Sequence, residues 1–253
     1  MNETQAGDTV LDAEKTYMTL RKLLAGTAVA LPLALVGGGW GLADLHVLPQ
    51  LSAYYFTSVG DLFVGMLCVI GIGLIAYKGF TDAEDIALNI GGVLICLVAL
   101  FHMEPKLALQ CFVKADIDPS EYLLRSLQFR VPSWLHFACA VMFYVVLGYV
   151  MIFCSHASLV LQSSAKAVRL YRRLYTSLGT GFVVSVVLSF AIYKLMPDEG
   201  CGNLWILVAE VLGLLCFAAF WMVKTHEISR SGADKKRAHI NRKMAAPNVR
   251  SLW

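Results

Sequence analysis

The chain has 253 residues, of which 58% are apolar and 15% are charged, and its mean hydropathy is +0.64. Soluble domains carry about 25% charged residues, so this composition excludes an ordinary soluble domain and favours a membrane protein. The net charge of +3 is small, and the placement of the charges along the chain is therefore more informative than their sum.

A polar lead-in, residues 1–22, precedes the first apolar run and lacks the pattern of a signal peptide. We therefore expect the membrane segments themselves to direct insertion. The apolar runs that follow have the length and composition of membrane helices. They predict an all-α integral membrane protein, a bundle of six transmembrane helices at 23–42, 62–77, 86–101, 134–154, 174–195 and 204–223. The transmembrane domain would cover residues 23–223, and a basic tail would cover residues 224–253.

Residues 51–79 show the pattern of these spans most clearly. Tyr54 and Tyr55 precede Asp61, an apolar run follows, and Lys78 comes directly after it. Aromatic residues at one end of a span and a cation at the other are typical of the two membrane interfaces.

Two further segments carry a local pattern. In the long loop between the third and fourth spans, Asp118-Pro119 resembles a helix start and is followed by a leucine-rich face. This predicts an amphipathic helix on the outer face of the membrane. In the fifth span, small residues recur every four positions at Ser177, Gly181, Ser185 and Ser189. Such a stripe favours close helix packing, and a polar pore lining is the alternative.

The Lys and Arg residues predict the orientation of the chain. If the amino terminus lies inside, 16 of the 21 Lys and Arg residues lie on the inner side. The positive-inside rule then places both termini in the cytoplasm. The basic tail would be solvated or lie against anionic lipid, and no accompanying fold pattern indicates nucleic-acid binding.

Several ionisable residues then fall on the outer side of the membrane. Glu210 is the deepest, because it lies about 10 Å below the interface at 1.5 Å per residue. A carboxylate at this depth should face the bundle interior or a water-filled cavity. We predict an outward-opening polar pocket for a small molecule or lipid, with Asp61, His136 and Glu210 on its floor and Tyr54 and Tyr55 at its rim.

Other functions fit the same residues. His102 and His136 with Glu210 or Asp61 would supply the nitrogen and oxygen ligands that zinc accepts, as in a metal-dependent membrane hydrolase of lipid amides or esters. However, no HExxH motif is present. A proton-coupled carrier would use Glu210 and a histidine, although we find no internal repeat. A structural role, as a homo-oligomer or as a subunit of a membrane complex, also stays open.

The cysteines do not form a CxxC motif, which argues against zinc-ribbon and thioredoxin-like folds. Most of them lie in apolar runs, where cysteine acts as a small apolar residue. Cys111 and Cys201 fall in outer loops on the predicted topology. They would form either a disulfide or two free thiols.

Three segments together resemble a family of uncharacterised multi-pass bacterial inner-membrane proteins: SAYYFTSVGDLFVGMLCVIGIGLIAYKG, LNIGGVLICLVALF and WLHFACAVMFYVVLGY. The resemblance implies a bacterial inner-membrane location, and its recurring polar positions match Tyr54, Tyr55, Asp61, His136 and Glu210 of this chain. Two positions depart from the pattern: Gly60 stands where a basic residue is usual, and the third span ends FHMEP. No activity follows from this family. Polar residues at the membrane edge also resemble those of ceramidase-like membrane hydrolases, but the paired histidines of those enzymes are missing.

Overall fold

The computed structural model describes residues 3–43, 47–101, 132, 134–195 and 204–234. These residues form α-helices and short 3-10 helices and contain no strand, so the predicted all-α fold is confirmed for the described part of the chain. The elements are α1 (Glu3–Ala43), η1 (Leu51–Phe56), α2 (Gly60–Ala76), α3 (Asp82–Leu100), α6 (Trp134–Ile152), η2 (Cys154–Leu161), α7 (Ala165–Leu195) and α8 (Trp205–Ser231).

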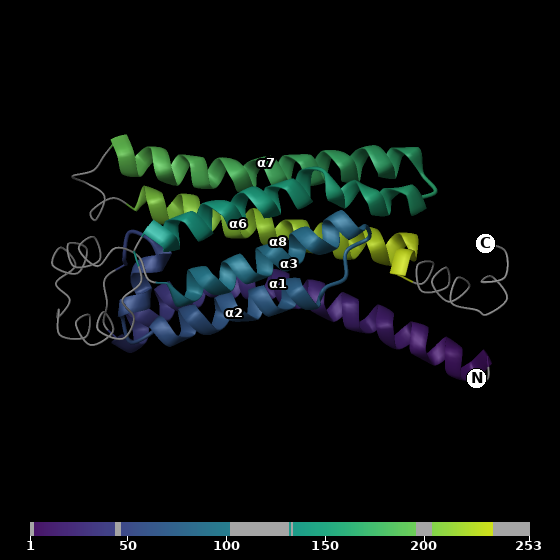
Figure 1. The fold of residues 1–253 in the computed structure, drawn as a ribbon, viewed down its shortest axis with the longest axis horizontal. Helices are drawn as coiled ribbons and strands as arrows, with labels where there is room; N and C mark the ends of the chain where they lie inside the picture. Colours follow the sequence, from purple (N-terminus) through teal and green to yellow (C-terminus); the bar gives the residue numbers. More distant parts are fainter. Residues whose placement is uncertain (1–2, 44–46, 102–131, 133, 196–203, 235–253) are drawn as a thin grey trace.

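The long helices lie side by side along the long axis of the molecule (Figure 1). Each packs against the next in chain order, and α8 packs back against α1, which closes a ring of helices. The α2–α3 contact is especially close, because a Cβ on Gly92 would lie 2.5 Å from the carbonyl oxygen of Gly71. Only a residue without a side chain fits there.

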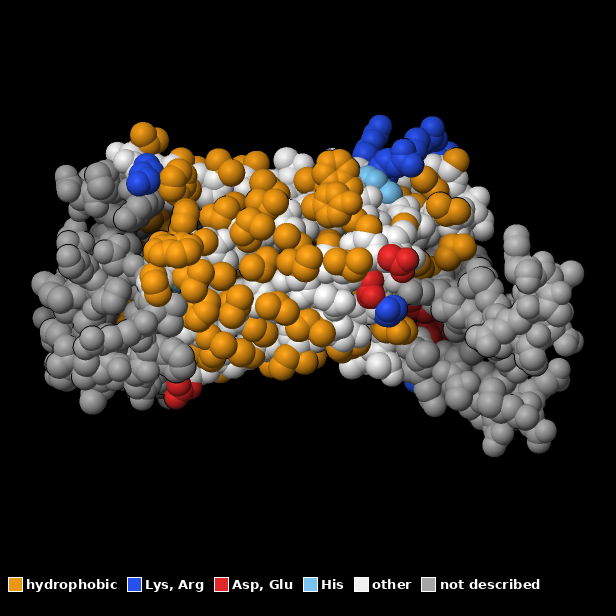
Figure 2. Space-filling view, viewed as in Figure 1, with side chains coloured by type: hydrophobic (Ala, Val, Ile, Leu, Met, Phe, Trp, Pro, Cys, Tyr) orange, Lys and Arg blue, Asp and Glu red, His pale blue; other side chains and the backbone are white. Residues whose placement is uncertain are grey.

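The outer surface of the ring is apolar. Figure 2 shows hydrophobic side chains over the middle of the molecule and charged side chains toward its ends. Within the described ranges, five helices are long and apolar enough to cross a membrane, and α2 is apolar but shorter. At 1.5 Å per residue, the 17 residues of α2 span about 25 Å, against about 30 Å of hydrocarbon core. The chain is therefore a polytopic helical membrane protein.

Three helices extend far beyond the predicted spans. α1 already begins at Glu3, because the polar lead-in contains no helix-breaking proline and continues directly into the first span. α7 begins at Ala165, ahead of the predicted span at 174–195, and therefore includes the basic residues from Lys166 to Arg173. α8 continues to Ser231 and ends where Gly232 adopts a left-handed conformation, with φ of 62°.

The extension of α8 corrects the predicted tail, which was expected to begin at Lys224. The Lys224 side chain is fully buried and pairs with Glu84 of α3. The apolar run ends at this residue, but the helix continues because its inner face is still packed. The predicted amphipathic helix after Asp118 lies outside the described residues.

Candidate functional site

A cavity of about 110 Å³ lies on the axis of the helix ring. Every long helix and η1 contribute residues to the cavity wall, so the cavity forms only when the whole bundle is assembled. Its lining is mostly apolar, and the polar side chains among the lining residues are Ser52, His136, Tyr144 and Glu210. Pockets that bind small molecules commonly combine an apolar wall with a few polar groups in this way.

Aromatic side chains form one side of the cavity. Phe143 and Tyr144 of α6 lie against Phe182 of α7, and the rings of Tyr144 and Phe182 stack with centroids 4.4 Å apart. Phe182 also contacts Phe217 of α8, at 6.3 Å between centroids. These rings hold each other in place, so the aromatic wall is preorganised.

Glu210 supplies the carboxylate of the cavity. It shares one face of α8 with Leu214 and Phe217, because the spacing of four and then three residues returns to the same side of a helix. The backbone N–H of Leu51 donates to one carboxylate oxygen of Glu210 at 2.7 Å. Leu51 is the first residue of η1, so this contact attaches η1 to α8 at one end of the cavity.

His136 lines the same cavity from α6. Its Nδ1 lies 2.5 Å from the carbonyl oxygen of Phe101 and 3.2 Å from that of Val98. Because carbonyl oxygens only accept hydrogen bonds, Nδ1 must carry the proton. The ring thereby joins the start of α6 to the end of α3.

The other predicted site residues lie outside the cavity lining. The Tyr54 side chain is 1% exposed, and its hydroxyl accepts a hydrogen bond from the backbone N–H of Leu48 at 3.1 Å. Burial raises the pKa of Tyr54. Tyr55 is half-buried and packs edge-on against Phe56. Asp61 is exposed in the first turn of α2. Of the three residues predicted for the pocket floor, only Glu210 and His136 line the cavity.

The predicted metal site and disulfide involve residues for which the structure gives no account. His102, Cys111 and Cys201 lie outside the described residues. Within the described ranges, no group of three or more His, Cys, Asp or Glu side chains is arranged to hold a metal ion. Zinc binding by His102, His136 and Glu210 therefore stays a prediction.

Comparison with known proteins does not add an assignment. No protein-family model, no curated protein and no solved structure matches this chain. The resemblance to uncharacterised inner-membrane proteins thus contributes no activity, and the function has to be argued from the site itself.

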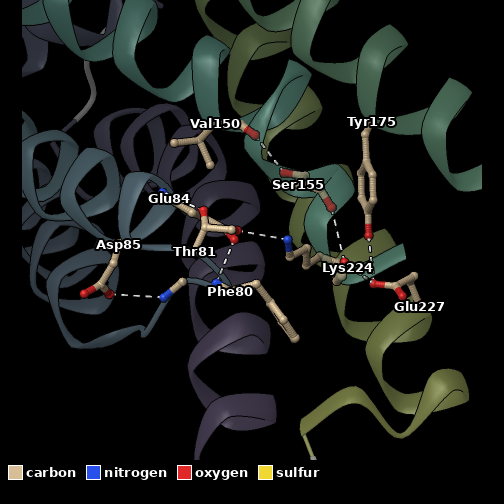
Figure 3. A network of polar contacts seen from close by, with 11 residues as sticks. Phe80, Thr81, Glu84, Asp85, Val150, Ser155, Tyr175, Lys224 and Glu227 are labelled. Carbon is tan, nitrogen blue, oxygen red and sulfur yellow. Dashed lines mark hydrogen bonds and ion pairs between the residues drawn. The ribbon is translucent and has the colours of Figure 1, made fainter. Parts of the chain in front are cut away.

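A second polar cluster, which was not predicted from the sequence, lies toward the other end of α8 from Glu210. We call it the Lys224 network (Figure 3). Lys224 Nζ donates to Glu84 at 2.9 Å, and the side chains of both residues are at most 1% exposed. The second oxygen of Glu84 accepts the backbone N–H of Phe80 at 2.8 Å, and Glu84 N–H donates to Thr81 Oγ1. The ammonium group also lies 5.7 Å from the Tyr175 ring centroid.

A second buried carboxylate extends this network to η2 and α7. Glu227 accepts hydrogen bonds from Ser158 Oγ at 2.8 Å, from Gln162 Nε2 at 3.3 Å and from the Tyr175 hydroxyl at 3.4 Å. Its side chain is fully buried. The Lys224 network therefore fixes α3, η2, α7 and α8 to one another, as expected for buried charges that are paired and hydrogen-bonded.

Two patterns in the sequence could have indicated this network. Thr81 followed three residues later by Glu84 is a capping box, which predicts the start of α3. Lys224 lies on the same helix face as Phe217 and Trp221, because the spacings are four and three residues. A lysine that continues a buried face requires an acidic partner, and Glu84 is that partner.

Proposed function

We propose that this chain is a membrane protein with six crossing helices that binds a small molecule in the axial cavity. The proposal depends on one observation: Glu210 and His136 come from different helices and line the same apolar cavity. A carboxylate inside a membrane bundle is costly to maintain, and such residues often mark ligand or ion sites.

The size of the cavity limits the ligand. An apolar cavity of about 150 Å³ accommodates benzene, whereas pockets for drug-sized molecules measure roughly 300–1,000 Å³. A cavity of about 110 Å³ thus suits a group of a few heavy atoms. Such a group could be a whole small molecule or the end of a longer one, and it would have an apolar body and a polar end near Glu210.

The distribution of charge supports an orientation for the site. The described Lys and Arg residues between Lys166 and Arg173 lie at the start of α7, and Lys78 lies in the α2–α3 turn. By the positive-inside rule these segments face the cytoplasm. The end of the cavity that carries η1 then faces outward, both termini are cytoplasmic, and a bacterial inner membrane is the location that the family resemblance favours.

The proposal can be tested by probe binding to the purified full-length protein. The probes are straight-chain alcohols and amines of three to six carbons, detected by saturation-transfer NMR. We expect binding to the wild type and loss of binding in Ala140→Phe, because Ala140 lines the cavity and a phenyl group there would fill it.

Val93→Phe is the matched control, since Val93 is 51% exposed on the outer surface of α3. This control should bind like the wild type. Equal probe signals for the wild type and Ala140→Phe would mean that the probes bind elsewhere, and the proposal would then be wrong.

A further inference from the structure

The charged and polar groups around the cavity indicate which class of ligand it takes. Glu210 is the only residue with a formally charged side chain among the described lining residues, and Lys and Arg are absent from that part of the wall. The site therefore favours positive charge and disfavours an anionic ligand.

The hydrogen bonding of Glu210 leaves capacity for a ligand. A carboxylate can accept about four hydrogen bonds through two oxygens. Leu51 N–H donates to one of the two oxygens, so the carboxylate keeps capacity to accept further hydrogen bonds. A ligand that donates hydrogen bonds from a positively charged group would complete the hydrogen bonding of this carboxylate.

The aromatic wall favours the same kind of ligand. Phe143, Tyr144, Phe182 and Phe217 line the cavity. The faces of aromatic rings carry negative partial charge and attract cations within about 6 Å, more strongly where water is excluded. A carboxylate beside several rings is thus complementary to an organic cation, whose apolar carbons also gain contact with the rings.

From these features we propose that the axial cavity binds a small primary ammonium ion. This inference rests on the proposed function and specifies its ligand class. The ammonium group pairs with Glu210, and the alkyl part lies against Phe143, Phe182 and Phe217. A cavity of about 110 Å³ has room for a short alkyl chain but excludes a bulky amine.

Two probes of nearly the same shape test the charge directly. n-Butylammonium and n-butanol differ mainly in the charge of the terminal group, so the ratio of their dissociation constants isolates the electrostatic contribution. We expect the wild type to bind n-butylammonium more tightly by about tenfold or more, the effect of one charge-assisted hydrogen bond. Glu210→Gln should abolish this preference and retain the affinity for n-butanol.

Asp61→Asn is the matched control, because it removes a carboxylate that is exposed and outside the cavity lining. It should keep the wild-type preference. The comparison within the wild type needs no variant, so poor folding of Glu210→Gln leaves the test intact.

The outcomes separate the two proposals. Equal affinities of the wild type for the two probes, both lost in Ala140→Phe, would overturn the ammonium inference and leave the proposed function standing. Failure of both probes to bind the wild type would overturn the proposed function as well.

Discussion

At the residue scale, two lysine–carboxylate pairs among the described residues lie in very different surroundings. The Lys224–Glu84 pair is buried, with side-chain exposures of 0% and 1%, and the Lys78–Asp85 pair is exposed, with 58% and 18%. Exposed pairs contribute about 0–1 kcal/mol to stability, because water screens them. Removal of one member of a buried pair costs about 3–5 kcal/mol, because the remaining charge stays buried without a partner.

We therefore predict that Lys224→Met strongly destabilises the protein. Glu84 would lose its cationic partner, and the expected loss is about 3–5 kcal/mol in the free energy of unfolding. The measurement is reversible unfolding in detergent. The double variant Lys224→Met with Glu84→Gln should recover much of the loss, since it removes both charges.

Lys78→Met is the control, with an expected change below about 1 kcal/mol. If Lys224→Met proved as mild as Lys78→Met, the Lys224 network would not hold the helices together as described.

At the element scale, η1 is the element most closely coupled to the site. Its first residue donates to Glu210, and Thr57 Oγ1 donates to the carbonyl oxygen of Tyr54 near its other end. The hydrogen bond to Glu210 is a link between η1 and the lining of the cavity. The carboxylate therefore has a structural role in addition to the proposed ligand contact.

Glu210→Ala should loosen η1, because the Leu51 N–H loses its acceptor. We expect hydrogen exchange of the peptide that contains Leu51 to become faster by about tenfold or more, the effect of one hydrogen bond to a charged group. Exchange within α2 should stay unchanged. In Glu210→Gln the side-chain carbonyl keeps an acceptor, so its exchange should lie closer to the wild type. Unaltered exchange in Glu210→Ala would show that the contact does not hold η1.

Prediction from sequence succeeded for elements whose pattern is local. Apolar runs predicted the positions of the helices, and the depth of Glu210 in its run predicted an inward-facing carboxylate. The prediction that the small-residue stripe packs closely against a neighbouring helix is confirmed at the centre of the stripe. There Gly181 lies close to Cys216 of α8, and Ser185 lies close to Gly213 of α8. Ser177, at the start of that stripe, is exposed.

The sequence was less informative where the burial of a residue depends on contacts with residues far away in the chain. Lys224 looked like the start of a solvated tail, because its partner Glu84 is 140 residues away. Asp61 looked like a pocket residue because it lies at the predicted interface, yet the rotation of α2 directs Phe63, Leu67 and Ile70 to the cavity instead. Helix rotation depends on packing against every neighbour, and one sequence does not determine it.

At the scale of the whole molecule, the closed ring explains why one cavity can be lined by every long helix. The membrane topology depends on whether α2 crosses, because α2 is the shortest of the apolar helices. If α2 crosses the membrane, the α2–α3 turn lies on the same side as the amino terminus. If it does not, the turn and the amino terminus lie on opposite sides.

Cysteine labelling of intact cells tests this topology. Single cysteines at Asp82, Ser164 and Pro132, all exposed, are introduced into a variant without the native cysteines. An impermeant maleimide should label the cysteine at position 132 from outside, and the cysteines at positions 82 and 164 only after the membrane is opened. Labelling at position 82 from outside would contradict the proposed topology, which is six crossings with both termini in the cytoplasm.

The most direct measurement of the central claim is the location of a bound ligand in crystals of the full-length protein soaked with 4-bromobutylammonium. The account predicts an anomalous bromine peak inside the helix ring, among Phe143, Phe182 and Phe217, with the ammonium nitrogen at hydrogen-bonding distance from Glu210. A bromine peak only on the outer surface of the bundle, or an empty cavity at a saturating concentration of the probe, would contradict it.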